Sequence, residues 1–170
     1  MEAFFYCQSL KKFHFPASLT RIENGVFSYN GFEEITIPGT VKYVDGAFGY
    51  SDTLKKVVVE EGVEVLDWGA FYGNDNLETV ILPEGLRYIG SQQFCYSSIK
   101  TLDIPESVEY IGSGAFDYTD LEFVPYNNGL YYPKGSNGKA ILVEVEDKSA
   151  TTFTVSADTV IILPSAFTGS

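Results

Sequence analysis

The sequence repeats one apolar pattern about every 22 residues, and this periodicity constrains the fold more than any other feature. An apolar residue followed by proline, or by a polar residue in its place, recurs at steps of 22, 22, 23 and 22 residues and once more after 51. The occurrences are Phe15-Pro16, Ile37-Pro38, Val59-Glu60, Leu82-Pro83, Ile104-Pro105 and Val155-Ser156. A phenylalanine closes each unit, and these residues are Phe4, Phe27, Phe48, Phe71, Phe94, Phe116 and Phe167.

A unit of this length cannot bury its own apolar face, so the units must stack on one another as a solenoid. In each unit an alternation of apolar and polar residues ends at the proline position, which predicts a short strand with one buried face. The next segment, such as residues 111–116 (Ile-Gly-Ser-Gly-Ala-Phe), contains too much glycine for a long helix. We therefore expect one β-rich solenoid over residues 1–170, with short helical turns.

Composition limits the classes of function. The chain has 170 residues, 45% of them hydrophobic, which is typical of one folded domain. Its formal net charge of −12 repels nucleic acids and anionic lipid surfaces. No apolar run is long enough to span a membrane, and the first 20 residues do not have the order of a signal peptide.

The chain offers little material for catalysis. Its one imidazole belongs to His14, and the two cysteines and one histidine are too few for a zinc site. No hydrolase, metalloprotease or nucleotide-binding motif is present, so we expect no enzyme activity, no cofactor and no metal. A glycosidase that uses two carboxylates is a remote alternative, since the chain holds 23 acidic residues.

The repeat resembles the BspA-like leucine-rich repeats, whose unit runs L-x-x-I-x-I-P-x-x-V-x-x-I-G-x-x-A-F-x-x-C-x-x-L. The similarity covers residues 3–124 and 151–167. The departures are Phe32 and Ile99 at the opening leucine, Glu60 and Ser156 at the proline, and Thr159 at the valine. The resemblance implies a right-handed leucine-rich solenoid without catalytic residues. It also implies an extracellular or cell-surface location, because proteins of this family are commonly secreted or surface-attached in bacteria and protists and bind other proteins or host surfaces.

Two rows of charge alternate in sign from one unit to the next. The first row is Lys11, Glu33, Lys55, Glu78, Lys100 and Glu122, and the second is Lys42, Glu64, Arg87 and Glu109. Stacking places opposite charges on strands about 4.8 Å apart, where each pair contributes about 0.2–1 kcal/mol. We interpret both rows as structural features that set the register of the stack rather than as a binding patch.

A small residue that can hydrogen-bond stands three positions after each closing phenylalanine. These residues are Cys7, Asn30, Ser51, Asn74, Ser97 and Thr119. We expect their side chains to pair with backbone groups of the stacked turns. Four coils separate Cys7 from Cys95, a distance on the order of 19 Å. A disulfide needs Cα atoms within about 7 Å, so the stacking predicts two free thiols.

Two surfaces are candidate binding sites for a protein or a glycan. A row of tyrosines stands two positions after the closing phenylalanines, interrupted at Gly73, and comprises Tyr6, Tyr29, Tyr50, Tyr96 and Tyr118. The solvent side of the strands carries His14, Thr36, Val58, Ile81 and Asp103. The alternatives are that the tyrosines pack on one another to close the turns, and that Val58 and Ile81 only favour strand structure. A thinner row, Tyr43, Tyr88 and Tyr110, has the same two interpretations.

About 29 extra residues separate Phe116 from Phe167, and we expect a β-hairpin insertion at about 125–150. Two strand-like runs flank Asn137-Gly138, a strong hairpin signal. The sequence starts and stops within a repeat, without an evident polar cap. We therefore expect a part of a longer protein that can associate end to end. A structural spacer that binds nothing is the alternative to a binding module.

Overall fold

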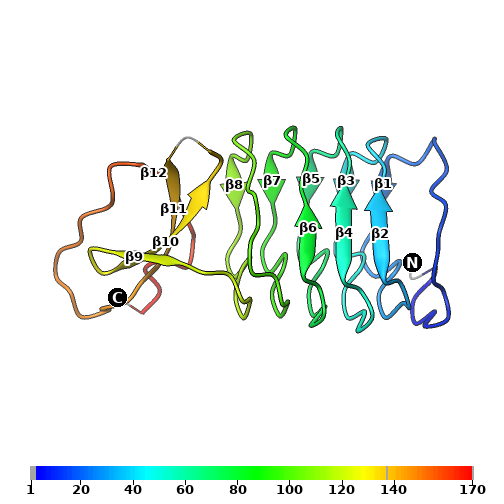
Figure 1. Ribbon diagram of the computed structural model, residues 1–170, viewed down its shortest axis with the longest axis horizontal. Helices are drawn as coiled ribbons and strands as arrows, with labels where there is room; N and C mark the ends of the chain where they lie inside the picture. The colour runs from blue at the N-terminus through cyan, green and yellow to red at the C-terminus, as the bar shows by residue number, and fades with distance from the viewer. Residues whose placement is uncertain (1–2, 137, 170) are drawn as a thin grey trace.

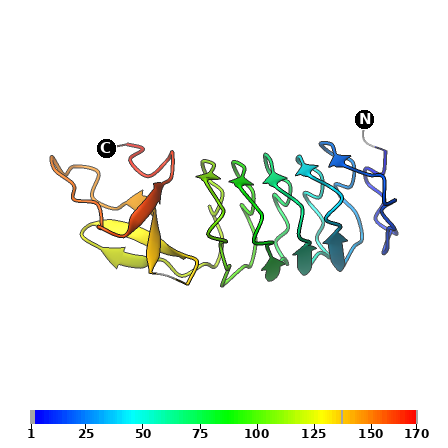
Figure 2. The ribbon, with the colours of Figure 1, turned by 90° about the horizontal axis from the view of Figure 1, so that it is seen from above.

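The computed structural model describes residues 3–136 and 138–169 and shows an elongated stack of β-rich coils (Figure 1). Successive coils follow one another along the long axis, so residues one repeat apart in the sequence lie side by side. Viewed from above, the strands of the coils lie on two sides of the stack, and the last quarter of the chain forms a separate sheet at one end (Figure 2). The predicted solenoid is confirmed.

Three strands form a parallel sheet on one side of the stack. They are β2 (Glu34–Ile37), β4 (Lys56–Val59) and β6 (Thr79–Ile81), with β4 in the middle. Their register aligns Ile35, Val57 and Val80, which are one repeat apart and buried. Side chains alternate between the core and the surface, because successive residues of a strand point to opposite faces.

Five two-residue strands form a second parallel sheet. They are β1 (Arg21–Ile22), β3 (Tyr43–Val44), β5 (Val65–Leu66), β7 (Tyr88–Ile89) and β8 (Tyr110–Ile111), in the order β1-β3-β5-β7-β8. The second residue of each strand is buried, and the first is partly or fully exposed. Each pairing joins residues at equivalent positions of adjacent repeats.

The glycine-rich segments after these five strands are turns, and the expectation of short helical turns is wrong. The described residues contain no helix. Each segment includes a residue with positive φ, and such a residue ends a right-handed helical run after one turn. These residues are Gly25 (72°), Gly46 (41°), Gly69 (57°), Gln92 (55°) and Gly114 (66°).

A column of phenylalanine rings runs through the core. Its buried members are Phe27, Phe48, Phe71, Phe94 and Phe116. Neighbouring ring centroids lie 5.2, 5.7, 6.1 and 6.5 Å apart, with the planes within 15° of parallel. The ring of Phe4 extends the column at 5.3 Å from Phe27. The closing phenylalanines therefore hold the coils together as the stacking predicts.

The small polar residues bond to backbone groups of the turns, as expected. The amide of Asn74 donates hydrogen bonds to the carbonyls of Phe48 (3.0 Å) and Phe71 (2.9 Å), while its Oδ1 accepts the N–H of Ser51 (2.7 Å). The side chains of Asn30, Ser97 and Thr119 also donate to backbone carbonyls. These bonds satisfy buried peptide groups that have no strand partner.

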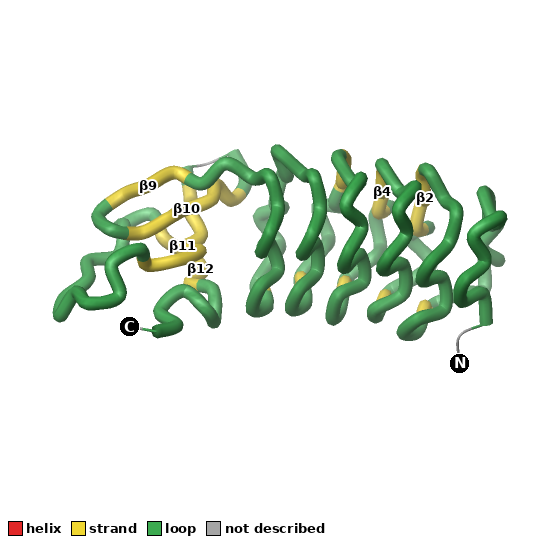
Figure 3. The backbone as a smooth tube through the Cα atoms, turned by 90° about the horizontal axis from the view of Figure 1, so that it is seen from below, coloured by secondary structure: helices red, strands yellow, loops and turns green. Residues whose placement is uncertain are grey.

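The insertion folds as the predicted hairpin. Strand β10 (Gly129–Lys134) pairs antiparallel with β11 (Lys139–Val145). Asn137 of the expected turn lies outside the described residues. Strands β9 (Val124–Tyr126) and β12 (Thr159–Ile162) complete a four-stranded sheet in the order β12-β11-β10-β9. This sheet lies at the end of the stack, beyond the last regular coil (Figure 3).

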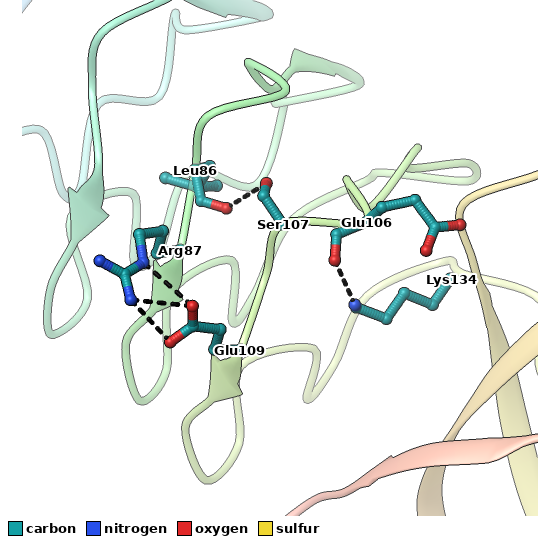
Figure 4. Close-up of polar contacts among 6 residues, drawn as sticks. All are labelled: Leu86, Arg87, Glu106, Ser107, Glu109 and Lys134. Atoms are coloured by element: carbon teal, nitrogen blue, oxygen red, sulfur yellow. Dashed lines mark hydrogen bonds and ion pairs between the residues drawn. The ribbon is translucent and has the colours of Figure 1, made fainter.

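Polar contacts dock the hairpin on that coil. The hydroxyl of Tyr132 bonds to both the N–H (2.8 Å) and the C=O (3.0 Å) of Leu102. Lys134 is buried, and its Nζ donates to the carbonyl of Glu106 at 2.8 Å (Figure 4). Burial lowers the pKa of Lys134. The hairpin thus takes the place that the next coil of the stack would occupy.

Phe167 does not join the phenylalanine column, although its repeat position predicts that it should. The neighbour of Phe116 beyond the last coil is the ring of Tyr132, at 6.2 Å. Phe167 instead packs edge-on against Phe153, at 5.4 Å. The reason is that the final repeat stacks on the hairpin, through the parallel pairing of β12 with β11, rather than on the preceding coil.

Candidate recognition surfaces

The solvent side of the first sheet brings three of the predicted binding residues together. Thr36, Val58 and Ile81 are cross-strand neighbours in β2, β4 and β6. Val58 is half-buried, whereas Ile81 is exposed. His14 and Asp103 are exposed as well, but they lie outside the strands. The apolar part of this face is therefore a small pair of β-branched side chains.

The tyrosine row is continuous along the turns of the stack. Neighbouring ring centroids are 4.5 to 5.8 Å apart in the series Tyr6, Tyr29, Tyr50, Tyr72, Tyr96 and Tyr118. Tyr72 closes the gap expected at Gly73, because its ring meets those of Tyr50 and Tyr96 edge-on. The rings pack on one another and still face solvent, with Tyr118 72% exposed. A binding role for the row stays a prediction.

The backbone at the tyrosine row is left-handed. The φ angles of Tyr6, Tyr29, Tyr50, Tyr96 and Tyr118 lie between 55° and 60°. Gly73, at the same place in its turn, has a φ of 68°. This conformation costs a non-glycine residue about 1–2 kcal/mol, whereas glycine adopts it freely. The turn geometry alone therefore favours glycine at every one of these positions.

A groove of about 270 Å³ lies beside the tyrosine row. Its aromatic side chains are Phe5, Tyr29, Tyr50, Trp68 and Tyr72. Sequence reasoning missed both the groove and Trp68. The sequence signal was the spacing between closing phenylalanines. Phe27 and Phe48 are 21 residues apart in the sequence, whereas the other steps between regular coils are 22 or 23 residues.

The groove forms where one turn is a residue shorter than its neighbours. Residues 44–48 connect the strand to the closing phenylalanine with one residue fewer than residues 66–71 do. Gly46 and Gly69 both have positive φ and both donate their N–H to a carbonyl of the following coil. Gly46 is thus the counterpart of Gly69, and the shortened turn lacks a counterpart of Trp68.

The second row of tyrosines makes its polar contacts within the chain. The guanidinium of Arg21 lies 3.7 Å from the ring centroid of Tyr43. The hydroxyl of Tyr43 donates a hydrogen bond to Asp67, which raises the pKa of Tyr43 to about 12. Tyr88 and Tyr110 stack with a centroid distance of 4.6 Å. These contacts favour a structural role for this row.

The two charge rows behave differently. The second row contains ion pairs between Lys42 and Glu64 (3.8 Å) and between Arg87 and Glu109 (2.8 Å; Figure 4). In the first row the N–H of Lys55 bonds to the carbonyl of Glu33 (2.9 Å), which confirms the stacking. Within the described part of the chain, no ion pair under 4.0 Å joins the side chains of that first row. Exposed pairs of this kind add little stability.

Potential metal ligands and thiols lie apart from one another. Cys7 and Cys95 are both free, as predicted. Burial raises the pKa of the Cys95 thiol. Across residues 3–136 and 138–169, no three histidine, cysteine, aspartate or glutamate side chains gather in an arrangement suited to a metal ion. No helix in the same ranges has the length and apolar character needed to cross a bilayer.

Two solved structures resemble this one. A leucine-rich repeat protein from Bacteroides ovatus is 22% identical, with a TM-score of 0.49 over 98% of this chain and 60% of that chain. A leucine rich cell surface protein from Faecalibacterium prausnitzii is 19% identical, with a TM-score of 0.39 over 87% of this chain and 62% of that chain. The chain thus spans about 60% of the length of each. No curated protein matches the sequence.

A family comparison agrees with the repeat pattern. The family model described as the BspA type leucine rich repeat region matches residues 32–134 in 6 copies. This range includes all strands of the first sheet and four of the five strands of the second. It covers more than half of the 170 residues. The chain therefore belongs to the BspA type leucine-rich repeat family.

Proposed function

We propose that this chain is a non-catalytic recognition or adhesion module of a cell-surface or secreted protein, and that it binds a protein or a glycan on another cell or in a matrix. The observation that carries the proposal is the row of exposed and half-buried tyrosines on left-handed backbone. Leucine-rich repeat proteins generally act through protein interaction rather than catalysis, and membership of the family supports the same conclusion.

The energetics of the row favour a role beyond packing. Each tyrosine on left-handed backbone costs about 1–2 kcal/mol relative to a relaxed conformation. A stacked ring pair contributes about 0.5–1.5 kcal/mol beyond the area that it buries, so the stacking contribution is of the same size as the backbone cost. Glycine, as at Gly73, avoids that cost without any ring. Tyrosine is enriched among the residues that dominate binding interfaces. Binding of a ligand would explain why tyrosine stands at these strained positions instead of glycine.

Glycine substitutions separate binding from stability at these positions. The double variant Tyr96→Gly/Tyr118→Gly removes two surface rings and relieves the left-handed backbone, so its melting temperature should stay close to that of the intact chain. The intact chain should bind at least one member of a panel of immobilised extracellular proteins and glycans. The variant should bind that ligand at least tenfold more weakly.

A matched variant tests the other candidate surface. Val58→Asp/Ile81→Asp places charge on the solvent side of β4 and β6 and leaves the tyrosine row intact. It should keep the affinity of the intact chain. If instead this variant loses binding while the tyrosine variant retains it, the sheet face is the recognition surface and the tyrosine argument is wrong. If no member of the panel binds, the chain is a spacer.

A further inference from the structure

The groove beside the tyrosine row has aromatic ends and a narrow floor of small residues. Ser28 and Gly49 follow the closing phenylalanines of two adjacent coils, and the coils on either side carry Phe5 and Tyr72 at that position. Trp68 is 52% exposed at the groove, opposite the space left by the shortened turn. Exposed tryptophan beside an open cavity is a common component of binding sites.

Two polar side chains of the lining, the exposed Asn24 and the nearly buried Ser28, are available to a ligand. Ser28 is only 6% exposed, it lines the groove, and its hydroxyl makes no hydrogen bond with any described residue. The Nδ2 atom of Asn24 lies 2.3 Å from the point where a Cβ on Gly46 would stand, so only glycine leaves room for this amide. A nearly buried hydroxyl without a protein partner must be satisfied by water or by a bound molecule.

Among the described residues that line the groove, none carries a charge, although the net charge of the chain is −12. An anionic ligand would meet this overall charge without a lysine or arginine in the groove to bind it. A cationic ligand would meet no carboxylate there and could be held only by the faces of the aromatic rings. The polar groups of the lining suit a neutral molecule with both apolar and hydrogen-bonding faces.

A sugar ring has this combination, because its C–H face packs on an aromatic ring while its hydroxyls need donors and acceptors. We propose that the groove binds a neutral saccharide of one or two rings. Trp68 packs on the apolar face of the sugar, and Ser28 and Asn24 bond to its hydroxyls. The volume of about 270 Å³ is just below the roughly 300–1,000 Å³ of pockets for larger small molecules. This inference rests on the recognition function proposed above.

The backbone of the groove does not favour strand addition by a peptide. The N–H of Gly25 bonds to the carbonyl of Gly46 (3.0 Å), and the N–H of Gly46 bonds to the carbonyl of Trp68 (3.0 Å). A peptide that adds to a sheet as a further strand binds through free main-chain groups at the strand edge. In the described turns around the groove, these groups already join one coil to the next.

The chain contains its own reporter for this site, because Trp68 is its one tryptophan. We would titrate the intact chain with neutral hexoses, N-acetylhexosamines and their disaccharides while recording tryptophan emission. A saturable change is expected with at least one of them. Ser28→Ala should weaken that binding at least fivefold, because it removes one hydrogen bond of about 1 kcal/mol. An alanine inserted between Asp45 and Gly46 restores the missing residue of the turn and should abolish the response.

The control is Ser107→Ala, which removes a serine hydroxyl that bonds to the carbonyl of Leu86 outside the groove and should leave the sugar titration unchanged. The groove assignment is overturned if no sugar alters the emission, or if Ser28→Ala binds as tightly as the intact chain. The groove assignment is also overturned if neutral peptides give a saturable change in emission and sugars do not. If panel ligands still bind in those cases, the recognition function stands and only the groove fails. If nothing binds, both proposals fail.

Discussion

Truncation of Phe71 tests the stacking of the coils directly. The ring is fully buried, with its centroid 5.7 Å from that of Phe48 and 6.1 Å from that of Phe94. Removing a fully buried phenylalanine side chain typically costs about 3–5 kcal/mol, because burial is lost and a cavity is left. Two ring contacts are lost as well, so we expect Phe71→Ala to lie in the upper half of this range. That is a large share of a typical domain stability of about 5–15 kcal/mol.

Phe167→Ala is the matched control, since Phe167 closes the final repeat in the sequence but lies outside the column. Its side chain is 41% exposed, and its one ring contact with a described residue is with Phe153. We expect a loss of about 1–2 kcal/mol. Urea unfolding followed by circular dichroism and by Trp68 fluorescence measures both variants. The slope of free energy against urea should match that of the intact chain, because the area exposed on unfolding hardly changes.

Equal losses for the two phenylalanines would refute the distinction between the column and the final repeat. A loss under about 1.5 kcal/mol for Phe71→Ala would show that the core tolerates a gap between coils. Two probes with different midpoints would show that the coils unfold in separate steps, as repeat proteins with weak interfaces do.

Three further substitutions test single interactions. Asn74→Ala leaves two carbonyls and one N–H unpaired in the core, so it should lower the free energy of unfolding by about 3 kcal/mol or more. The control Asn76→Ala alters an exposed side chain and should lower it by under about 1 kcal/mol. Tyr132→Phe keeps the ring but removes both bonds to Leu102, so a loss of about 2 kcal/mol is expected; no loss would mean that the hairpin docks through its apolar contacts. Burial, and then the charge of Asp67, raise the pKa of Asp45, so its charged form destabilises the folded chain above that pKa. Asp45→Asn should therefore raise stability at pH 7, and this gain should vanish below about pH 3.8, where both states hold a protonated acid; a gain that does not change with pH contradicts this cause.

The stacking of the repeats could be predicted from the sequence because each apolar position recurs in five consecutive units. A ladder constrains every residue in it, so Ile35, Val57 and Val80 align once the period is known. The buried amide of Asn74 was predictable for the same reason, as one member of a row of short polar residues. These features depend only on the repeat and not on the details of any single turn.

Other features depend on details that a period does not contain. A pattern of spacing does not reveal φ angles, so the left-handed tyrosines and the turns in place of helices were not predictable from it. The final repeat matches the family pattern, but its neighbour in space is decided by the hairpin, which pairs with it through β11 and β12. The alternating charges indicated the order of stacking correctly, yet among the described residues no ion pair joins the side chains of the first row.

Irregularities in the repeat allow one coil of this fold to differ from the next. A perfect repeat presents the same atoms on every coil, and a small ligand would then find no preferred position along the stack. Two irregularities lie in adjacent coils, on the same side as Trp68. One is the shortened turn at Gly46, and the other is the reversed order of tyrosine and glycine at Tyr72 and Gly73. The coils above and below are held in register by the phenylalanine column, so the loss of one residue opens a groove instead of letting the stack collapse around it. A defined site thus follows from an irregular turn within a regular core.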